Sequence, residues 1–316
     1  MEVVGIGNPV CDLLVNTEKF PEPDSSSKLL DYSWQGGGKV ATAVVTLARL
    51  GAKAGIIGVV ADDPFGRFCI KDFAKHGVDI SNLIIDKNKR NTFCVDMSEP
   101  GSMSRSICCN GGSTRALEKT DIDKKYIISA DFLHIENMNP PSLEAARIAR
   151  ENNMTVVIDA DHYQEEIQNN IDLIDIFIGS EFYYNSIFTG DDYRANCREI
   201  QKKGPEVVIF TLGEKGCKGV YEDLYFEQQA FEVDVKDTTG AGDVFHGAFI
   251  FGLIQDWKVE FTARFASAVA AIKCTRMGGR AAIPDLDTVL DFLETGEIDY
   301  TEIDRRVKFY KDGIFN

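Results

Sequence analysis

Short runs of apolar, mostly β-branched residues alternate along the chain with segments whose apolar positions recur every three to four residues. The short runs predict strands, and the longer periodic segments predict helices. The predicted strands are Val3–Gly7, Ala54–Val60, Phe132–Ile135, Thr155–Asp159, Ile174–Ile178 and Val207–Leu212. The predicted helices are Lys39–Leu50, Phe65–His76, Pro141–Asn152, Tyr193–Lys203, Ala241–Ile254 and Val259–Cys274. This alternation is typical of βαβ units and predicts an α/β fold with a mainly parallel central sheet.

Two stretches depart from this alternation. Leu13–Trp34 is polar and contains proline, and Arg90–Ile107 alternates like a hairpin with its turn at Glu99-Pro100-Gly101-Ser102. Alternation of period two around a Pro-Gly turn is the pattern of two antiparallel strands. We therefore expect these two stretches to lie outside the βαβ plan.

No linker, internal repeat or low-complexity tract interrupts the chain, so residues 1–316 are expected to form a single domain. The formal net charge of −16 disfavours a nucleic acid or an anionic membrane as a partner. No apolar run approaches the ~20 residues of a membrane span, and the first residues read as a strand rather than a signal peptide. We therefore expect a cytoplasmic protein. The charged tail Asp299–Asn316 is expected to form a last helix on the surface.

The cysteines predict neither a zinc site nor a disulfide framework. The chain has eight of them, without a C-x-x-C spacing and without paired histidines. They are Cys11, Cys69, Cys94, Cys108, Cys109, Cys197, Cys217 and Cys274. Reduced and mostly packed thiols are the interpretation that fits a cytoplasmic protein.

The most informative segment is Asp237-Thr238-Thr239-Gly240-Ala241-Gly242-Asp243. Phe231–Val235 before it alternates like a strand, and the apolar run after it is helical, so the order is strand, tight turn, helix. The amides at the helix start and the positive end of its dipole form an anion site, beside which Asp243 stands in the first turn. An anion site beside a carboxylate base suits the transfer of a phosphoryl group to a hydroxyl. The alternative is a capped helix after a glycine turn, without chemistry.

This segment resembles the C-terminal signature of the ribokinase-like, or PfkB, family of carbohydrate kinases. Gly37-Gly38-Lys39 at a helix start is similar to the first signature of that family, and Val3–Gly7 followed by Asp12 resembles its start. The resemblance implies a ribokinase-like fold, with helices on both faces of the sheet and a β-lid from segments at about 13–34 and 90–107. It implies ATP and Mg²⁺ as cofactors, a small sugar as substrate and a homodimer paired through the lid. A surface hairpin that does not move is the alternative to a lid.

The resemblance also assigns roles to particular residues. Asp243 would take the proton from the acceptor hydroxyl, and the amides of Gly240, Ala241 and Gly242 would bind the phosphoryl group. The residues implied at the sugar are Asp12, Gly37, Gly38, Lys39, Thr42, Glu136 and Arg105. Those implied at the nucleotide are Thr211, Gly213, Gly216 and Ser180. Because the turn before Asp243 lacks Lys and Arg, charge neutralisation there would depend on Mg²⁺ carried by ATP.

A monovalent cation is a further implication. Asp237 and Thr239 occur where family members commonly place ligands for such an ion, K⁺ for example. The other ligands would be backbone carbonyls around Cys274, Met277 and Gly279. Stabilisation of the turn by Asp237, without any ion, fits the sequence equally well.

The chain departs from the family pattern at three places. Thr42 stands where family members usually carry an Asn that contacts sugar hydroxyls. Ser180-Glu181-Phe182-Tyr183 stands in place of an Asn-x-x-Glu motif tied to magnesium and phosphate. Asp161 stands where many relatives have Asn, and its carboxylate is expected to help hold Mg²⁺ in place of the missing Glu. For Glu136 and Arg105 a solvated surface charge is the alternative to a sugar contact.

The function that these residues predict is an ATP-dependent kinase for a hydroxymethyl group of a small carbohydrate. A nucleoside kinase of the same fold and a non-catalytic sensor of nucleotide or sugar are the alternatives. A Rossmann dehydrogenase is disfavoured, because Gly5-Ile6-Gly7 lacks the third glycine and Pro9 interrupts the helix start. His134 and His246 are expected to pack in the core.

Overall fold

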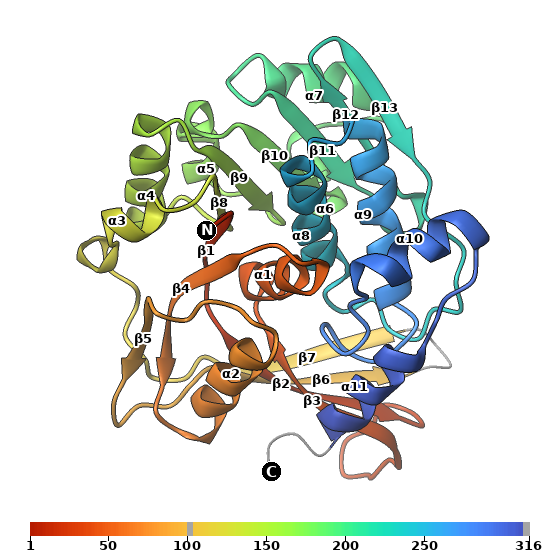
Figure 1. The fold of residues 1–316 in the computed structure, drawn as a ribbon. Coiled ribbons are helices and arrows are strands. Elements are labelled where there is room, and N and C mark those ends of the chain that lie inside the picture. The colour runs from red at the N-terminus through yellow and green to blue at the C-terminus, as the bar shows by residue number, and fades with distance from the viewer. Residues whose placement is uncertain (100–103, 312–316) are drawn as a thin grey trace.

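The computed structural model describes residues 1–99 and 104–311 as a large sheet covered by helices, with a smaller sheet beside it (Figure 1). The strands are β1 (Val3–Ile6), β2 (Val10–Thr17), β3 (Leu29–Gly37), β4 (Ala54–Ala61), β5 (Leu83–Asp86), β6 (Phe93–Glu99), β7 (Ser104–Asn110), β8 (Phe132–Ile135), β9 (Thr155–Ala160), β10 (Ile176–Ser180), β11 (Val207–Thr211), β12 (Cys217–Tyr221) and β13 (Leu224–Gln228). The α-helices are α1 (Lys39–Leu50), α2 (Pro64–Lys75), α3 (Lys124–Ile127), α4 (Pro140–Glu151), α5 (Glu165–Asn169), α6 (Glu181–Ile187), α7 (Tyr193–Gln201), α8 (Ala241–Ile254), α9 (Val259–Lys273), α10 (Leu286–Thr295) and α11 (Thr301–Lys311). Short 3-10 helices cover Lys119–Asp121, Ile171–Leu173 and Gly213–Lys215.

The large sheet has the strand order β13-β12-β11-β10-β9-β8-β1-β4-β5. Strands β11 through β5 pair in parallel, while β12 and β13 pair antiparallel at one edge. Strands such as β1 and β4 are continuous apolar runs because both faces of the sheet are covered there. The predicted α/β fold with a mainly parallel sheet is confirmed.

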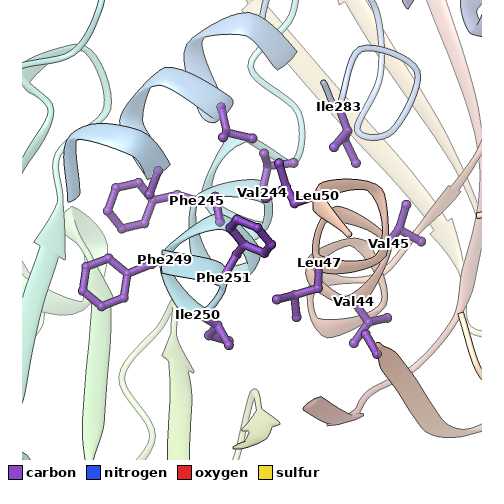
Figure 2. Close-up of a cluster of buried hydrophobic side chains, with 14 of the residues drawn as sticks. Val44, Val45, Leu47, Leu50, Val244, Phe245, Phe249, Ile250, Phe251 and Ile283 are labelled. Atoms are coloured by element: carbon purple, nitrogen blue, oxygen red, sulfur yellow. The ribbon is translucent and has the colours of Figure 1, made fainter. Parts of the chain in front are cut away.

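Each face of the sheet buries its own apolar core. On one face α1 and α8 pack together, with Leu47 and Leu50 of α1 on the side toward α8 (Figure 2). On the other face α4 and α7 pack against the strands. None of the helices that the structure describes is long and apolar enough to cross a lipid bilayer.

Helices α1 and α8 and strand β8 have the bounds predicted from the sequence, and the other predicted strands and helices of the βαβ plan differ by one or two residues at their ends. Phe231–Val235, however, is not a strand, so that prediction is wrong. Its Phe231 ring packs 5.3 Å from the ring of Phe292 on α10, and the segment does not join the sheet after β13. The alternation of apolar and polar residues in this segment therefore reflects packing of its apolar side against the protein rather than pairing with another strand.

The charged tail forms α11, and it is less superficial than expected. Ile303 and Tyr310 are 1% exposed, and Arg306 donates to the carbonyls of Ala281 and Ile283. The helix therefore braces the loop that follows α9. The end of the predicted tail helix, residues 312–316, lies outside the described part of the chain.

The smaller sheet contains both segments that departed from the βαβ plan. Its order is β3-β2-β6-β7, with β2 and β6 parallel and the other pairs antiparallel. We call these four strands the lid sheet. The predicted turn at 99–102 lies mostly outside the described residues, which resume at Ser104.

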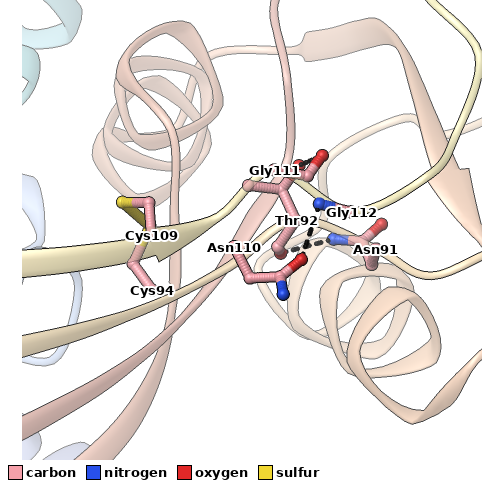
Figure 3. Close-up of a disulfide and its surroundings, with 7 residues drawn as sticks. All are labelled: Asn91, Thr92, Cys94, Cys109, Asn110, Gly111 and Gly112. Atoms are coloured by element: carbon pink, nitrogen blue, oxygen red, sulfur yellow. Dashed lines mark hydrogen bonds between the residues drawn. A yellow bond between two sulfur atoms is a disulfide. The ribbon is translucent and has the colours of Figure 1, made fainter.

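One pair of cysteines corrects the prediction of reduced thiols. Cys94 and Cys109 are directly opposite in the antiparallel pair β6–β7 and form a disulfide (Figure 3). The sequence did not reveal it because the pairing depends on the register of the hairpin. The free cysteines other than the exposed Cys108 are buried, as expected of packed thiols.

Candidate active site

The carboxyl ends of the parallel strands bring together residues that are far apart in the sequence. Glu136 follows β8, Asp161 follows β9, Ser180 ends β10 and Thr211 ends β11. Ser180 and Thr211 are partners in the register of β10 and β11. Open parallel sheets bind ligands beyond the carboxyl ends of their strands, so this edge is the expected place for a site.

Two glycine turns bring helix starts to the same edge. The two helices also pack closely against each other. Gly247, in the middle of α8, makes this possible, because a Cβ there would lie 2.4 Å from the carbonyl oxygen of Ala43 on α1. Lys39 begins α1, and Asp243 lies in the first turn of α8. Gly240 caps α8 with φ 73°, a left-handed conformation that glycine adopts without strain.

The turn before Asp243 is held by its own hydrogen bonds. The carboxylate of Asp237 accepts from the amides of Thr239 and Gly278, at 2.8 Å each. The amide of Ala241 donates to the carbonyl of Thr238 at 3.1 Å. Of the three amides predicted for the phosphoryl group, that of Ala241 is therefore already engaged. Gly242 is exposed and lies in the first turn, where amides lack an acceptor within the helix.

Lys39 is the positive charge among several carboxyl groups. Its ammonium lies 3.7 Å from Asp161 Oδ2. Burial alone would lower its pKa, but Asp159, Glu136, Asp161 and Asp243 raise it overall. The turn before Asp243 contains neither Lys nor Arg. The Lys39 ammonium at the start of α1 nevertheless interacts electrostatically with the Asp243 carboxylate. Sequence reasoning had placed Lys39 at the sugar and missed this role, because α1 and α8 are about 200 residues apart.

The carboxyl groups at this edge resist ionisation. Burial, more than any neighbour, raises the pKa of Asp12, Glu136, Asp159 and Asp243 to about 7 in each case. Repulsion between the carboxylates adds to this, for example from Asp159 on Asp243, while Lys39 opposes it. Such a cluster is suited to binding positive charge or hydroxyl protons.

We expect Glu136→Gln to stabilise the protein at pH 8, raising its Tm by roughly 2–5 °C, with no gain at pH 5. A carboxyl whose pKa is raised by folding holds its proton more tightly in the folded chain, so the free energy of unfolding falls between pH 4 and 7. The glutamine variant escapes that loss. Thermal unfolding from pH 5 to 8 measures it, with the exposed Glu165→Gln as control. A gain that persists at pH 5 would assign the effect to packing instead.

The glycine turn before α1 lies against Asp12. A Cβ at Gly37 would be 2.0 Å from Asp12 Oδ2, and one at Gly38 would be 2.2 Å from the carbonyl oxygen of Asn8. Only glycine therefore leaves room for this carboxylate. Thr42 is 1% exposed and its hydroxyl accepts from Arg280 Nε at 3.3 Å, while another nitrogen of the same guanidinium donates to the Gly37 carbonyl at 2.9 Å.

The lid sheet contacts the turn 237–243, proposed below as the catalytic turn, through Thr239. Arg105 of β7 donates to the Thr239 hydroxyl at 3.0 Å, and this hydroxyl donates to Asp96 Oδ2 at 3.2 Å. Asp96 is 6% exposed, its Oδ1 has no hydrogen-bond partner among the residues that the structure describes, and burial raises its pKa to about 6. Sequence reasoning missed Asp96, although it lies within the alternating segment that it assigned to the lid.

The predicted nucleotide residues occupy the far end of this edge. Gly213 and Gly216 both have positive φ, 58° and 83°, in a turn closed by the bond from Leu212 N to Gly216 O at 2.8 Å. Thr211 donates to the Gly179 carbonyl at 3.4 Å.

Ser180 connects β9 with α6. Its hydroxyl donates to the Asp161 carbonyl at 2.5 Å and accepts from the amide of Tyr183, which caps α6. The Asp161 carboxylate also contacts His162 Nδ1 at 2.8 Å. Ser180 thus fixes the backbone of the acid that was expected to hold Mg²⁺.

Two buried histidines lie behind the carboxyl cluster. The rings of His134 and His246 stack at 5.6 Å, and His246 Nε2 lies 3.6 Å from Asp159 Oδ1. Burial lowers the pKa of both rings to about 3, so they are neutral. They pack in the core as expected, but within residues 1–99 and 104–311 neither His134 Nε2 nor His246 Nδ1 has a hydrogen-bond partner.

Comparison with known proteins connects this geometry to an activity. The family model for pfkB family carbohydrate kinases matches residues 1–286. The chain is 29% identical over 287 residues to the 5-dehydro-2-deoxygluconokinase of Photobacterium profundum, covering 83% of this chain and 87% of that protein. It is 29% identical over 300 residues to the ribokinase of Haemophilus influenzae, covering 92% and 97%. The structure of Arabidopsis thaliana ribokinase complexed with ribose and ATP has the same fold, with a TM-score of 0.78 at 22% identity over 93% of this chain and 98% of that one.

Proposed function

The chain belongs to the pfkB family of carbohydrate kinases, and we propose that it transfers the γ-phosphoryl group of ATP to a hydroxymethyl group of a small sugar, with Asp243 as the base. That it is an ATP-dependent sugar kinase follows from the family; the roles of its residues are the proposal. The observation that supports these roles is that the first turns of α1 and α8 lie at the same edge of the sheet. Asp243 on α8 and Lys39 on α1 act on each other at the edge where the parallel strands end.

In the proposed reaction, Asp243 accepts the proton of the attacking hydroxyl. The sugar oxygen then forms its bond to phosphorus as the bond from phosphorus to the leaving oxygen of ADP breaks. The amides of Gly240 and Gly242 and the Lys39 ammonium stabilise the charge that spreads over the phosphoryl oxygens. Gly240 and Gly242 belong to the turn that Asp237 holds through the amides of Thr239 and Gly278, so their amides need little reorganisation during the reaction.

The sugar would lie between the first glycine turn and the lid sheet. Asp12 and Glu136 offer carboxyl oxygens to sugar hydroxyls, and the absence of side chains at Gly37 and Gly38 allows close approach. The unpartnered Oδ1 of Asp96 offers a further acceptor from the lid sheet. Lid closure onto the sugar would exclude water and suppress ATP hydrolysis.

The nucleotide would bind at the other end of the edge, near Ser180, Thr211, Gly213 and Gly216. The carboxylate of Asp161 is a suitable ligand for Mg²⁺, which prefers oxygen donors. No group of three or more acidic, His or Cys side chains forms a metal site within the described residues, so ATP would contribute most of the ligands. Bound Mg²⁺ would neutralise charge on the phosphates.

The test is ADP release with MgATP over a panel of ketoses, aldoses, keto sugar acids and nucleosides. Keto sugar acids and ribose come first, because the relatives are named for a deoxygluconate kinase and for ribokinase. Turnover of one sugar class supports the proposal and identifies the acceptor. Turnover of nucleosides alone would replace it with the nucleoside kinase alternative. The same assay on Asp161→Ala should need more Mg²⁺ for half its maximal rate, and an unchanged requirement would remove the role of Asp161.

A homodimer through the lid sheet and a cytoplasmic location complete the proposal. The lid sheet exposes large apolar side chains, with Leu30 54%, Tyr32 46% and Ile107 49% exposed, which supports a partner there. We expect sedimentation velocity to give a dimer that Tyr32→Glu dissociates, and a monomeric wild-type protein would refute it. Use of ATP supports the cytoplasm, whereas the Cys94–Cys109 disulfide is unusual in a reducing compartment.

A further inference from the structure

The residues expected to bind a monovalent cation do not fit that role. Both carboxylate oxygens of Asp237 already accept backbone amides, as described above. The Cys274 carbonyl accepts from the amides of Lys236 at 2.8 Å and Asp237 at 3.2 Å, and the Met277 carbonyl accepts from Gln35 Nε2 at 2.9 Å. Because the carboxylate oxygens of Asp237 and these two carbonyl oxygens are oriented toward their N–H donors, they are not free to converge on one ion.

A lysine ammonium occupies this neighbourhood instead. Lys273, the last residue of α9, is 0% exposed and its Nζ donates to the main-chain carbonyl of Asp237 at 2.9 Å. The C-terminal end of a helix favours a positive charge. A second cation beside this ammonium would be repelled, and the chain already supplies the charge that an ion would bring.

The charge of Lys273 acts on three carboxyl groups around the turn. Burial would raise the pKa of Asp237, but Lys273 and the amides of Thr239 and Gly278 lower it overall. Lys273 also opposes the upward pKa shifts that burial imposes on Asp96 and Asp243. One ammonium thus connects α9, the catalytic turn and the lid sheet.

We infer that Lys273 is a built-in cation that positions the turn 237–243, so that phosphoryl transfer by this chain needs no monovalent metal ion. This inference rests on the proposed kinase function. Lys273 is a positioning residue, because it acts through Asp237 and not on the reacting atoms. A small displacement of the turn would move the amides and Asp243 away from the phosphoryl group.

The first experiment compares rates in K⁺, Na⁺ and tetramethylammonium chlorides at equal ionic strength, with MgATP and the accepted sugar. We expect the wild-type rates to agree within about twofold. Lys273→Met should lower kcat by about 10–100-fold, with a smaller change in the KM of the sugar. Lys273→Ala should recover part of the rate with K⁺ or ammonium, in a saturable manner, and Lys273→Arg should keep most of it.

Lys236→Met is the matched control, since Lys236 is exposed, pairs with Asp234 and precedes the same turn. It should leave the rate and its cation response unchanged. Activation of the wild-type enzyme by K⁺ of tenfold or more would overturn the inference. So would variants of Lys273 that lose activity without any response to cations, because that loss would indicate a merely structural role.

Thermal unfolding gives a readout that does not depend on kinase activity. The Tm of the wild-type protein should be the same in K⁺ and tetramethylammonium, while Lys273→Ala should gain stability specifically in K⁺ or ammonium. An equal Tm of this variant in all three salts would overturn the inference. Should no sugar be phosphorylated, the proposed function fails while this arm still tests Lys273.

Discussion

We expect Asp243→Asn to lower kcat by about 10³–10⁴-fold, while binding of ATP and sugar changes little. The amide of asparagine has the shape of the carboxylate but cannot accept the proton of the attacking hydroxyl. The rest of the anion site is unchanged, since the amides of the turn and Lys39 do not depend on that proton. Steady-state kinetics and equilibrium binding of each substrate, measured on the same preparation, separate the two effects.

The pH profile adds an independent test of the same base. Burial, then Asp159, raises the pKa of Asp243 to about 7, so kcat/KM of the wild-type enzyme should fall as the pH drops below 7 and the carboxylate gains a proton. The residual activity of Asp243→Asn should lack this acid limb. The exposed Asp234→Asn is the control and should keep both rate and profile. If Asp243→Asn retained a tenth of the wild-type kcat, another group would be the base.

The fold was largely predictable because its elements are strongly patterned. Lys39–Leu50 and Ala241–Ile254 were predicted with the bounds observed, since a glycine precedes each helix and a long run rich in apolar residues follows it. The prediction of a strand at Phe231–Val235 failed for a physical reason. Alternation of apolar and polar residues requires only that one side of the segment pack against the protein, and Phe231 does so by packing on Phe292 rather than by joining a sheet. Local pattern alone does not distinguish these two outcomes.

The family and the sugar kinase activity were predicted correctly from two short motifs, and these motifs also contain Asp243 and Lys39. The interactions between distant elements were not predictable in the same way. Asp96 reaches the catalytic turn only through the pairing of the lid strands. Lys273 did leave a signal, as a charge at the end of an apolar, alanine-rich helix, but the position of its ammonium depends on how α9 meets the turn.

The role of Arg280 was also not predicted from the sequence. Of the replacements considered, that of Arg280 should change the free energy of unfolding most. Arg280 is 1% exposed and donates to Asp72 Oδ2 at 2.5 Å and to the Gly37 carbonyl at 2.9 Å. Burial would raise the pKa of Asp72, but His76 and Arg280 lower it well below its ordinary value, so Asp72 is ionised. Arg280→Met would leave that carboxylate buried without its main countercharge.

We expect Arg280→Met to lower the free energy of unfolding by about 3–5 kcal/mol, measured by urea denaturation at pH 7. Exposed Arg305→Met should change it by less than about 0.5 kcal/mol. The double variant Arg280→Met with Asp72→Asn should recover part of the loss, because the uncompensated charge is then gone. A double variant as unstable as the sum of the two single variants would show that packing, not charge, is what Arg280 supplies. Since the same guanidinium holds the Gly37 carbonyl, the single variant should also raise the KM of the sugar, which connects the buried ion pair to the first glycine turn.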